Sequence, residues 1–149
     1  MSGEASLILG GQIRGRAPEI MLIYPQGNYI EASNETPYLQ IGETKYGKPV
    51  LDRFLESGTP LERAALIALI SLEGTARSNV TVGPPFEIGL MRRDSFACKH
   101  MSFGEDTDHL MQVRTGWEQG LRGTLDTLPQ LDWESAPSAT PLAPDAPAR

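Results

Sequence analysis

The spacing of the apolar residues changes near residue 45 from a period of two to a period of about 3.6, so the chain must contain both strands and helices. Before this point, apolar segments separated by turn-forming residues predict strands over residues 6–13, 19–24, 29–32 and 38–41. Gly10 and Gly11 predict a bulge or bend in the first strand. The sequence PQGN at residues 25–28 predicts a hairpin turn.

After this point the pattern predicts helices separated by a second hairpin. One helix carries its apolar face on Tyr46, Val50, Leu51, Phe54 and Leu55 and ends near Ser57. A capping box begins the next helix, with Thr59 as N-cap, Pro60 at N1 and Glu62 at N3, and the helix continues to about Arg77.

Alternating residues then predict two strands around a turn at residues 94–95, with Phe86, Ile88 and Leu90 before it and Phe96, Cys98 and His100 after it. A last helix begins at Asp106 or Asp108 and ends before Pro129. The predicted fold class is therefore α+β, with antiparallel sheets covered by helices. Residues 1–133 form the structured part, and residues 134–149, rich in proline and alanine, are expected to be a disordered tail.

Composition excludes several classes of function. The net charge is −6 and the basic residues are scattered, which argues against a nucleic-acid partner. No apolar run is long enough to cross a membrane, and a single cysteine, Cys98, favours a reducing cytoplasm. Two histidines and one cysteine leave little for a zinc site, and neither a metal nor a cofactor is expected.

Individual side chains give little sign of catalysis. No G-x-S-x-G nucleophile elbow is present. His100 is interpreted as a half-buried strand residue, His109 as a surface residue and Cys98 as a small core residue. The leucines and Trp117 of the last helix are expected in the core. Two polar stretches stand out. Residues 42–45 join a strand to a helix, where the glycine allows close backbone approach and the N-terminal amides of the helix can hold an anion. Residues 77–85 lead from a helix into a strand, and both stretches can equally be ordinary caps and turns.

Three segments resemble a known family. Residues 20–31 read IMLIYPQGNYIE and resemble the strand-turn-strand of proteasome β-type subunits. Residues 39–53, LQIGETKYGKPVLDR, resemble the glycine-rich junction of those subunits, and residues 77–85, RSNVTVGPP, resemble the bacterial proteasome-type peptidases called Anbu, the ancestral β subunit. The resemblance implies the Ntn-hydrolase αββα sandwich, threonine-type peptidase chemistry on peptide substrates, and self-association or assembly with other proteasome-like subunits.

The resemblance covers only the C-terminal part of such a subunit. In that family an N-terminal threonine is the nucleophile, and a following Asp and Lys tune its amine; no counterparts of these three residues are found here, so no catalytic residue is assigned. The resemblance implies that this chain supplies the residues that support the active site. Gly42 matches the first glycine of the family's Gly-Ser-Gly junction, and Glu43 stands in place of the serine. Downstream, Ser78 stands near the family's Asp, Thr81 near its second serine, and Gly83 in the following turn.

Three alternatives remain. Removal of Met1 would expose Ser2 as a substitute nucleophile, but Pro18 and Glu19 stand where a supporting Asp and Lys are needed. The chain can instead be a non-catalytic assembly module. Without the resemblance, it reads as a small α+β ligand-binding domain.

If about 90–100 family residues are lacking, as typical domain sizes indicate, apolar side chains are expected to stay uncovered. The candidates are Tyr24, Ile30, Phe86, Ile88 and Leu90.

The composition of the tail generates one prediction. Deleting residues 135–149 should change the free energy of unfolding by no more than about 0.5 kcal/mol, because the segment has little apolar surface to bury. Thermal melting of the full and shortened chains measures this. A loss of several degrees in melting temperature would mean that the tail packs.

Overall fold

The N-terminal third forms an antiparallel sheet in the computed structural model, which describes residues 3–135. Strands β1 (Leu7–Gly11), β2 (Glu19–Ile23) and β3 (Tyr29–Glu31) lie in that order. The β1–β2 register is continuous from Leu7–Ile23 to Gly11–Glu19, so the predicted bulge at Gly10 and Gly11 is wrong. The predicted turn before β3 is confirmed: the Tyr24 amide donates to the Asn28 carbonyl, and Gly27 has a φ of +87°.

The predicted strand over residues 38–41 does not form. This segment is irregular and half-buried except for Ile41, and it has no partner strand among the described residues. Its side chains instead face the first helix: the Tyr38 hydroxyl donates to Asp52 Oδ1. Side-chain contacts to a helix have therefore replaced the backbone ladder that a strand requires.

Two helices follow, close to their predicted places. Helix α1 spans Lys48–Phe54 and helix α2 spans Leu61–Ser78. The predicted capping box is wrong in detail, because Pro60 is the N-cap residue of α2 and no side chain caps it. The Thr59 side chain instead bonds to the residues before it: its Oγ1 accepts a hydrogen bond from the Glu56 amide at 2.9 Å.

The second hairpin consists of β4 (Phe86–Met91) and β5 (Cys98–Phe103), and helix α3 (Asp108–Thr127) ends the described fold. The prediction that Phe96 begins a strand is wrong, because Phe96 lies in the turn with a φ of +49°. Cys98 and His100 are exposed, which corrects their expected burial. Both lie on the face of β4–β5 opposite to Phe86 and Phe103, since side chains alternate along a strand.

The core lies between α2, β4–β5 and the start of α3. Four buried side chains form it: Leu69, Phe86, Phe103 and Leu110. Each comes from a different element, so the core fixes α2, both strands of the hairpin and α3 against one another.

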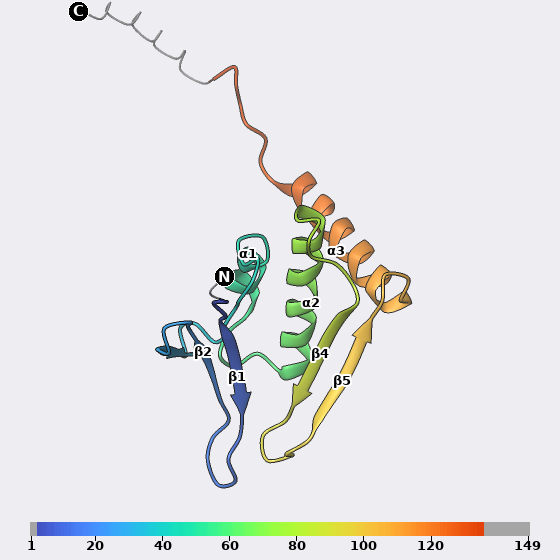
Figure 1. Cartoon of the computed structure of the whole chain (residues 1–149). Helices are drawn as coiled ribbons and strands as arrows, with labels where there is room; N and C mark the ends of the chain where they lie inside the picture. The colour runs from blue at the N-terminus through green and yellow to red at the C-terminus, as the bar shows by residue number, and fades with distance from the viewer. Residues whose placement is uncertain (1–2, 136–149) are drawn as a thin grey trace, which may run out of the picture.

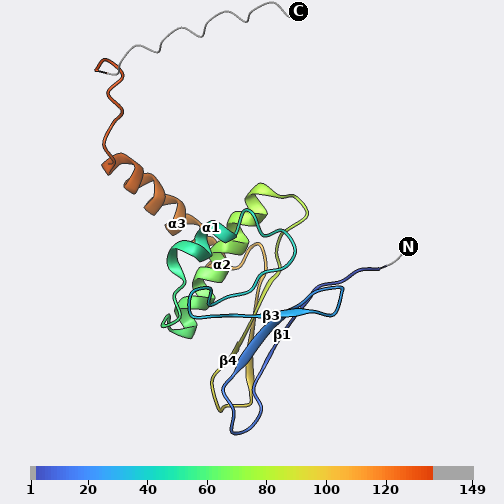
Figure 2. The ribbon, with the colours of Figure 1, turned by 90° about the vertical axis from the view of Figure 1, so that its left-hand side faces the viewer.

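The two hairpins run side by side and turn at the same end of the molecule (Figures 1 and 2). Their tips are joined by a reciprocal pair of hydrogen bonds. Gln12 Nε2 donates to Asp94 Oδ1 at 2.7 Å, and the Asp94 amide donates to Gln12 Oε1 at 2.7 Å. The guanidinium of Arg14 lies 4.7 Å from the ring centroid of Phe96 in the same region. These contacts hold the two sheets at one end.

The expected core role of the last helix is only partly correct. Leu110 is fully buried and Trp117 is half-buried, but three leucines further along the helix are exposed. They are Leu121, Leu125 and Leu128. These residues lie beyond the described contacts of α3 with α1 and α2, so nothing in the described chain covers them.

The expected uncovered face is also partly correct. Ile30 is exposed, whereas Phe86 is buried beneath α2. Tyr24, Ile88 and Leu90 are half-buried. Helix α2 therefore covers the start of the β4 row at Phe86 and leaves Ile88 and Leu90 partly exposed.

Gly47, the residue before α1, allows that helix to approach α2 closely. A Cβ atom built on Gly47 would lie 2.4 Å from Ser71 Oγ and 2.9 Å from Thr75 Oγ1. Both partners are buried side chains of α2, so they have little room to move aside. Any side chain at position 47 would push the two helices apart.

The Gly47→Ala variant should therefore lose about 1–3 kcal/mol of unfolding free energy through overpacking. Gly58→Ala is the matched control, because a Cβ there meets open space. Chemical denaturation of both variants measures the difference. Equal stability of the two would mean that α1 can shift at little cost.

Candidate functional site

The loop that enters α1 and the loop that leaves α2 lie together, and they carry most of the predicted site residues. Gly42 has a φ of +80°, a conformation that glycine adopts without steric cost. This turn directs the chain so that Glu43 reaches the C-terminal end of α2. There, Asn79 Nδ2 donates a hydrogen bond to Glu43 Oε2 at 3.0 Å.

Asn79 also holds Thr81 through its other amide atom. Its Oδ1 accepts from the Thr81 amide at 2.9 Å and from the Thr81 hydroxyl at 2.7 Å. Such a turn is typical of asparagine just after a helix, where its side chain replaces lost backbone bonds. Asn79 thus links Glu43 to Thr81, two residues that are 38 positions apart in the sequence.

The other two predicted residues are less closely involved. Ser78 is the last residue of α2 and is exposed. Gly83 is exposed beside the Pro84–Pro85 peptide bond, which is cis, and a Cβ there would meet open space. The structure therefore brings together Gly42, Glu43 and Thr81, and leaves Ser78 and Gly83 at the margin.

Asn79 is the residue that sequence reasoning missed. It lies in the segment RSNVTVGPP, which resembles the Anbu sequences, but the resemblance assigned roles only to neighbours of Asn79 in that segment. The available signal was its chemistry: an asparagine after a helical pattern, two residues before a threonine, is typical of a side-chain turn.

The carboxylate of Glu43 has the chemistry to accept bonds from a cationic group. A carboxylate that receives one hydrogen bond keeps further acceptor positions, and charge-assisted bonds to an ammonium group are stronger than neutral ones. Glu43 and Asn79 are both half-buried, which reduces competition from water.

A second polar cluster lies on α1. Lys48 Nζ donates to Asp52 at 2.7 and 2.9 Å and to the Tyr38 hydroxyl at 3.0 Å. The hydrogen bond from Lys48 lowers the pKa of Asp52, and the bond to Asp52 raises the pKa of Lys48. Burial, and then the bond to Asp52, raises the pKa of Tyr38. Lys48 and Asp52 are exposed and Tyr38 is half-buried, and the cluster joins the loop before α1 to the helix.

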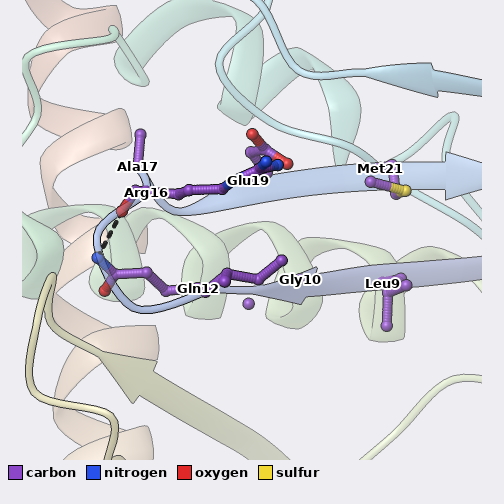
Figure 3. A pocket seen from close by; sticks show the side chains of 9 residues that line it. Leu9, Gly10, Gln12, Arg16, Ala17, Glu19 and Met21 are labelled. Atoms are coloured by element: carbon purple, nitrogen blue, oxygen red, sulfur yellow. Dashed lines mark hydrogen bonds between the residues drawn. The ribbon is translucent and has the colours of Figure 1, made fainter.

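A hollow of 390 Å³ lies along α3 beside Met111 and Thr115, and two others lie elsewhere on the described chain, all away from these residues. One, of 240 Å³, is at the turn end of β1–β2, where Gln12 Nε2 also donates to the Arg16 carbonyl at 2.8 Å (Figure 3). The other, of 410 Å³, lies between α2 and β4–β5 and is lined mainly by apolar side chains such as Leu66, Leu90 and Met101. Neither is lined by a predicted site residue, so the hollows and the Glu43–Asn79–Thr81 cluster are separate features.

Within residues 3–135, no group of three or more His, Cys, Asp or Glu side chains is placed to hold a metal ion. None of the helices in this range is long and apolar enough to cross a membrane.

The fold and the two sheets define a class of protein: a mixed α+β chain that forms part of an Ntn-hydrolase sandwich. No family model matches the chain, and no curated protein does. Several solved structures do match the chain. The chain is similar to Anbu, the ancestral β subunit, from Yersinia bercovieri, with 46% identity and a TM-score of 0.83 over 87% of this chain. It is also similar to Anbu from Hyphomicrobium sp. strain MC1, with 38% identity, a TM-score of 0.84 and the same 87% coverage.

A third structure, the helical assembly of the Anbu complex from Pseudomonas aeruginosa, is 43% identical with a TM-score of 0.83 over 88% of this chain. The match spans only 55–56% of these three solved chains. The chain is therefore Anbu-like over about 55% of the length of these structures, which confirms the family resemblance read from its sequence.

The linking role of Asn79 can be tested by substitution. Asn79→Ala should cost about 1–3 kcal/mol of unfolding free energy, because it removes the bonds to Glu43 and Thr81 and leaves part-buried groups unpaired. Ser78→Ala, at the exposed neighbouring position, is the control and should stay within about 0.5 kcal/mol. Denaturant unfolding gives both values. The linking role would be refuted if Asn79→Ala were as stable as the control.

Proposed function

We propose that this chain is the C-terminal part of a proteasome-type threonine peptidase subunit, and that it supplies the supporting half of the active site. The observation that carries the proposal is the Glu43–Asn79–Thr81 cluster, at the junction where the family resemblance places groups that support the catalytic amine. Similarity to Anbu structures over about 55% of their length supports the assignment as part of such a subunit.

In this proposal each clustered residue has a separate role. Glu43 accepts hydrogen bonds from the amine or lysine of the catalytic part and keeps it positioned. Asn79 holds the Glu43 carboxylate, and its bonds to Thr81 keep its own amide from rotating. Gly42 provides the turn, while Ser78 and Gly83 shape the adjoining loop. The nucleophile, an N-terminal threonine with its Asp and Lys, belongs to the catalytic part. The substrates are peptides, and the compartment is the cytoplasm.

A second candidate is a non-catalytic module that assembles with like subunits. Two observations favour it. Glu43 stands where the classical family has a serine and Ser78 near its Asp, so the amine-binding pattern is altered. One of the similar structures is described as a helical assembly. An intact mass of the native cellular product above the 16.2 kDa of this sequence would favour the first candidate, because the catalytic part would then be covalently attached.

Two-part complementation tests the first candidate directly. The part of Yersinia bercovieri Anbu that this chain does not match is expressed together with this chain. The proposal expects the two parts to co-purify, and expects Glu43→Ala to weaken their association more than Glu31→Ala, an exposed strand carboxylate. Failure to co-purify would contradict it.

By itself, the chain should show no threonine-type peptidase activity. The supporting groups can bind an amine but cannot attack a peptide bond, which requires a nucleophile with a base. A panel of fluorogenic peptides incubated with the purified chain provides the measurement. Hydrolysis that is lost in the Ser2→Ala variant would overturn the prediction. Ser2 lies outside the described residues.

A further inference from the structure

The hollow of 410 Å³ between α2 and the β4–β5 hairpin, here called the α2 hollow, is only partly filled by the core. Leu66 and Leu69 of α2 line one wall, and Leu90 and Met101 of the hairpin line the other. Met101 is 58% exposed although it lies on the same face of β5 as the buried Phe103. Apolar side chains therefore face an open space beside the core.

Charged side chains lie at the end of the α2 hollow nearest the turn of the hairpin. Arg92 follows β4 and pairs with Glu62 in the first turn of α2, so these two charges balance each other. Lys99 lies two residues before Met101 on the same face of β5 and also lines the hollow. In the part of the chain that the structure describes, no carboxylate forms an ion pair with Lys99. This end of the hollow therefore carries an unbalanced positive charge, in a chain whose net charge is −6.

Aromatic rings close the other end of the hollow. Phe103 is buried there, and the ring of His109, in the first turn of α3, lies 5.5 Å from the Phe103 ring between centroids. Both residues line the hollow. Lys99 and Phe103 are four residues apart on one strand, a separation of about 13 Å. The hollow thus runs along β5 from a cationic end to an aromatic end.

The size and lining of the hollow indicate a class of ligand. Small-molecule sites typically have volumes of about 300–1,000 Å³ and combine apolar walls with a few polar groups that fix the orientation of the ligand. An unbranched alkyl chain gains favourable free energy from each methylene group that it buries along such walls. A carboxylate at the end of that chain would accept a charge-assisted hydrogen bond from the ammonium group of Lys99. A cationic head group would instead be repelled by Lys99.

We propose that the α2 hollow binds a straight-chain monocarboxylate of about eight to ten carbons, with its carboxylate on Lys99 and its alkyl chain directed toward Phe103. An extended chain of this length spans most of the distance of about 13 Å between these two residues. The proposal does not depend on the proposed peptidase function, because the hollow is lined by none of the residues Glu43, Asn79 and Thr81.

Calorimetric titration of the full chain with three compounds of equal chain length tests the ligand class. Octanoate should bind with a dissociation constant of about 1 mM or tighter. Octanol, which keeps the alkyl chain but has no charge, should bind several-fold more weakly, and octyltrimethylammonium more weakly still. Absence of octanoate binding at millimolar concentrations overturns the proposal. Equal affinity for all three compounds overturns it as well, because the head group would then play no part.

Two variants that each remove one positive charge test the role of Lys99. Lys99→Met should weaken octanoate binding about three- to fivefold, as expected for an exposed ion pair, and should leave octanol binding within about twofold. Arg93→Met is the matched control, since Arg93 is exposed in the hairpin turn, lies 3.9 Å from Asp94 and does not line the hollow. It should leave the binding of both compounds within about twofold. If the two variants weaken octanoate equally, the attraction comes from overall charge and the proposal fails.

A charge placed on the apolar wall tests the location. Met101→Glu should weaken octanoate binding about tenfold, because the new carboxylate repels the ligand, and the exposed position allows the fold to be kept. Met111→Glu, the same change at a position of α3 that is 43% exposed and lies outside the hollow, should leave binding within about twofold. Thermal melting shows whether each variant is folded. In the wild type, octanoate should shift the amide NMR signals of β5 and of the first half of α2. Shifts confined to other surfaces, or equal weakening by the two glutamate variants, would overturn the proposal.

Discussion

Helix α2 must be covered on two sides, because both of its long faces carry buried side chains. One face carries two small polar side chains, Ser71 and Thr75. Helix α1 can pack closely on this face only because the residue that meets it, Gly47, has no side chain. The other face carries Leu69 and packs on β4–β5. The positions of α1 and the second hairpin, and so of both loops at the candidate site, follow from how these two faces are filled.

Between these faces, a buried charge connects α2 to α3. Glu73 is 3% exposed and accepts a hydrogen bond from Arg114. A buried carboxylate is tolerated when a guanidinium satisfies it, and removing the partner alone would leave an uncompensated charge. This pair fixes where α3 lies against α2, beside the apolar contact of Leu110. The candidate site lies at the C-terminal end of the same helix, so its geometry depends on a helix that is held by three neighbours.

Much of this arrangement could be predicted from the sequence, because the deciding signals were local. The change of period identified the three helices and both hairpins, and the turn at residues 25–28 follows from Pro and Gly chemistry. Several of the errors share one cause, which is tertiary context. Residues 38–41 have strand-like composition but pack against α1, and Cys98 and His100 alternate like core residues but lie on the uncovered face. At the site, Glu43 and Thr81 were found through the family resemblance. The turn of Asn79 with Thr81 could have been predicted from its local chemistry, but the bond of Asn79 to Glu43 exists only once the two loops meet.

The reciprocal contact between Gln12 and Asp94 has a consequence for the order of folding. It joins residues 82 positions apart, whereas each hairpin closes over a short loop. Local hairpins form in microseconds, but a contact across such a distance must wait until the intervening helices have brought the two tips together. We therefore expect the Gln12–Asp94 contact to form in the last steps of folding, after the transition state. Its loss would leave the folding rate unchanged and would appear as faster unfolding, with the tips opening before the helical core.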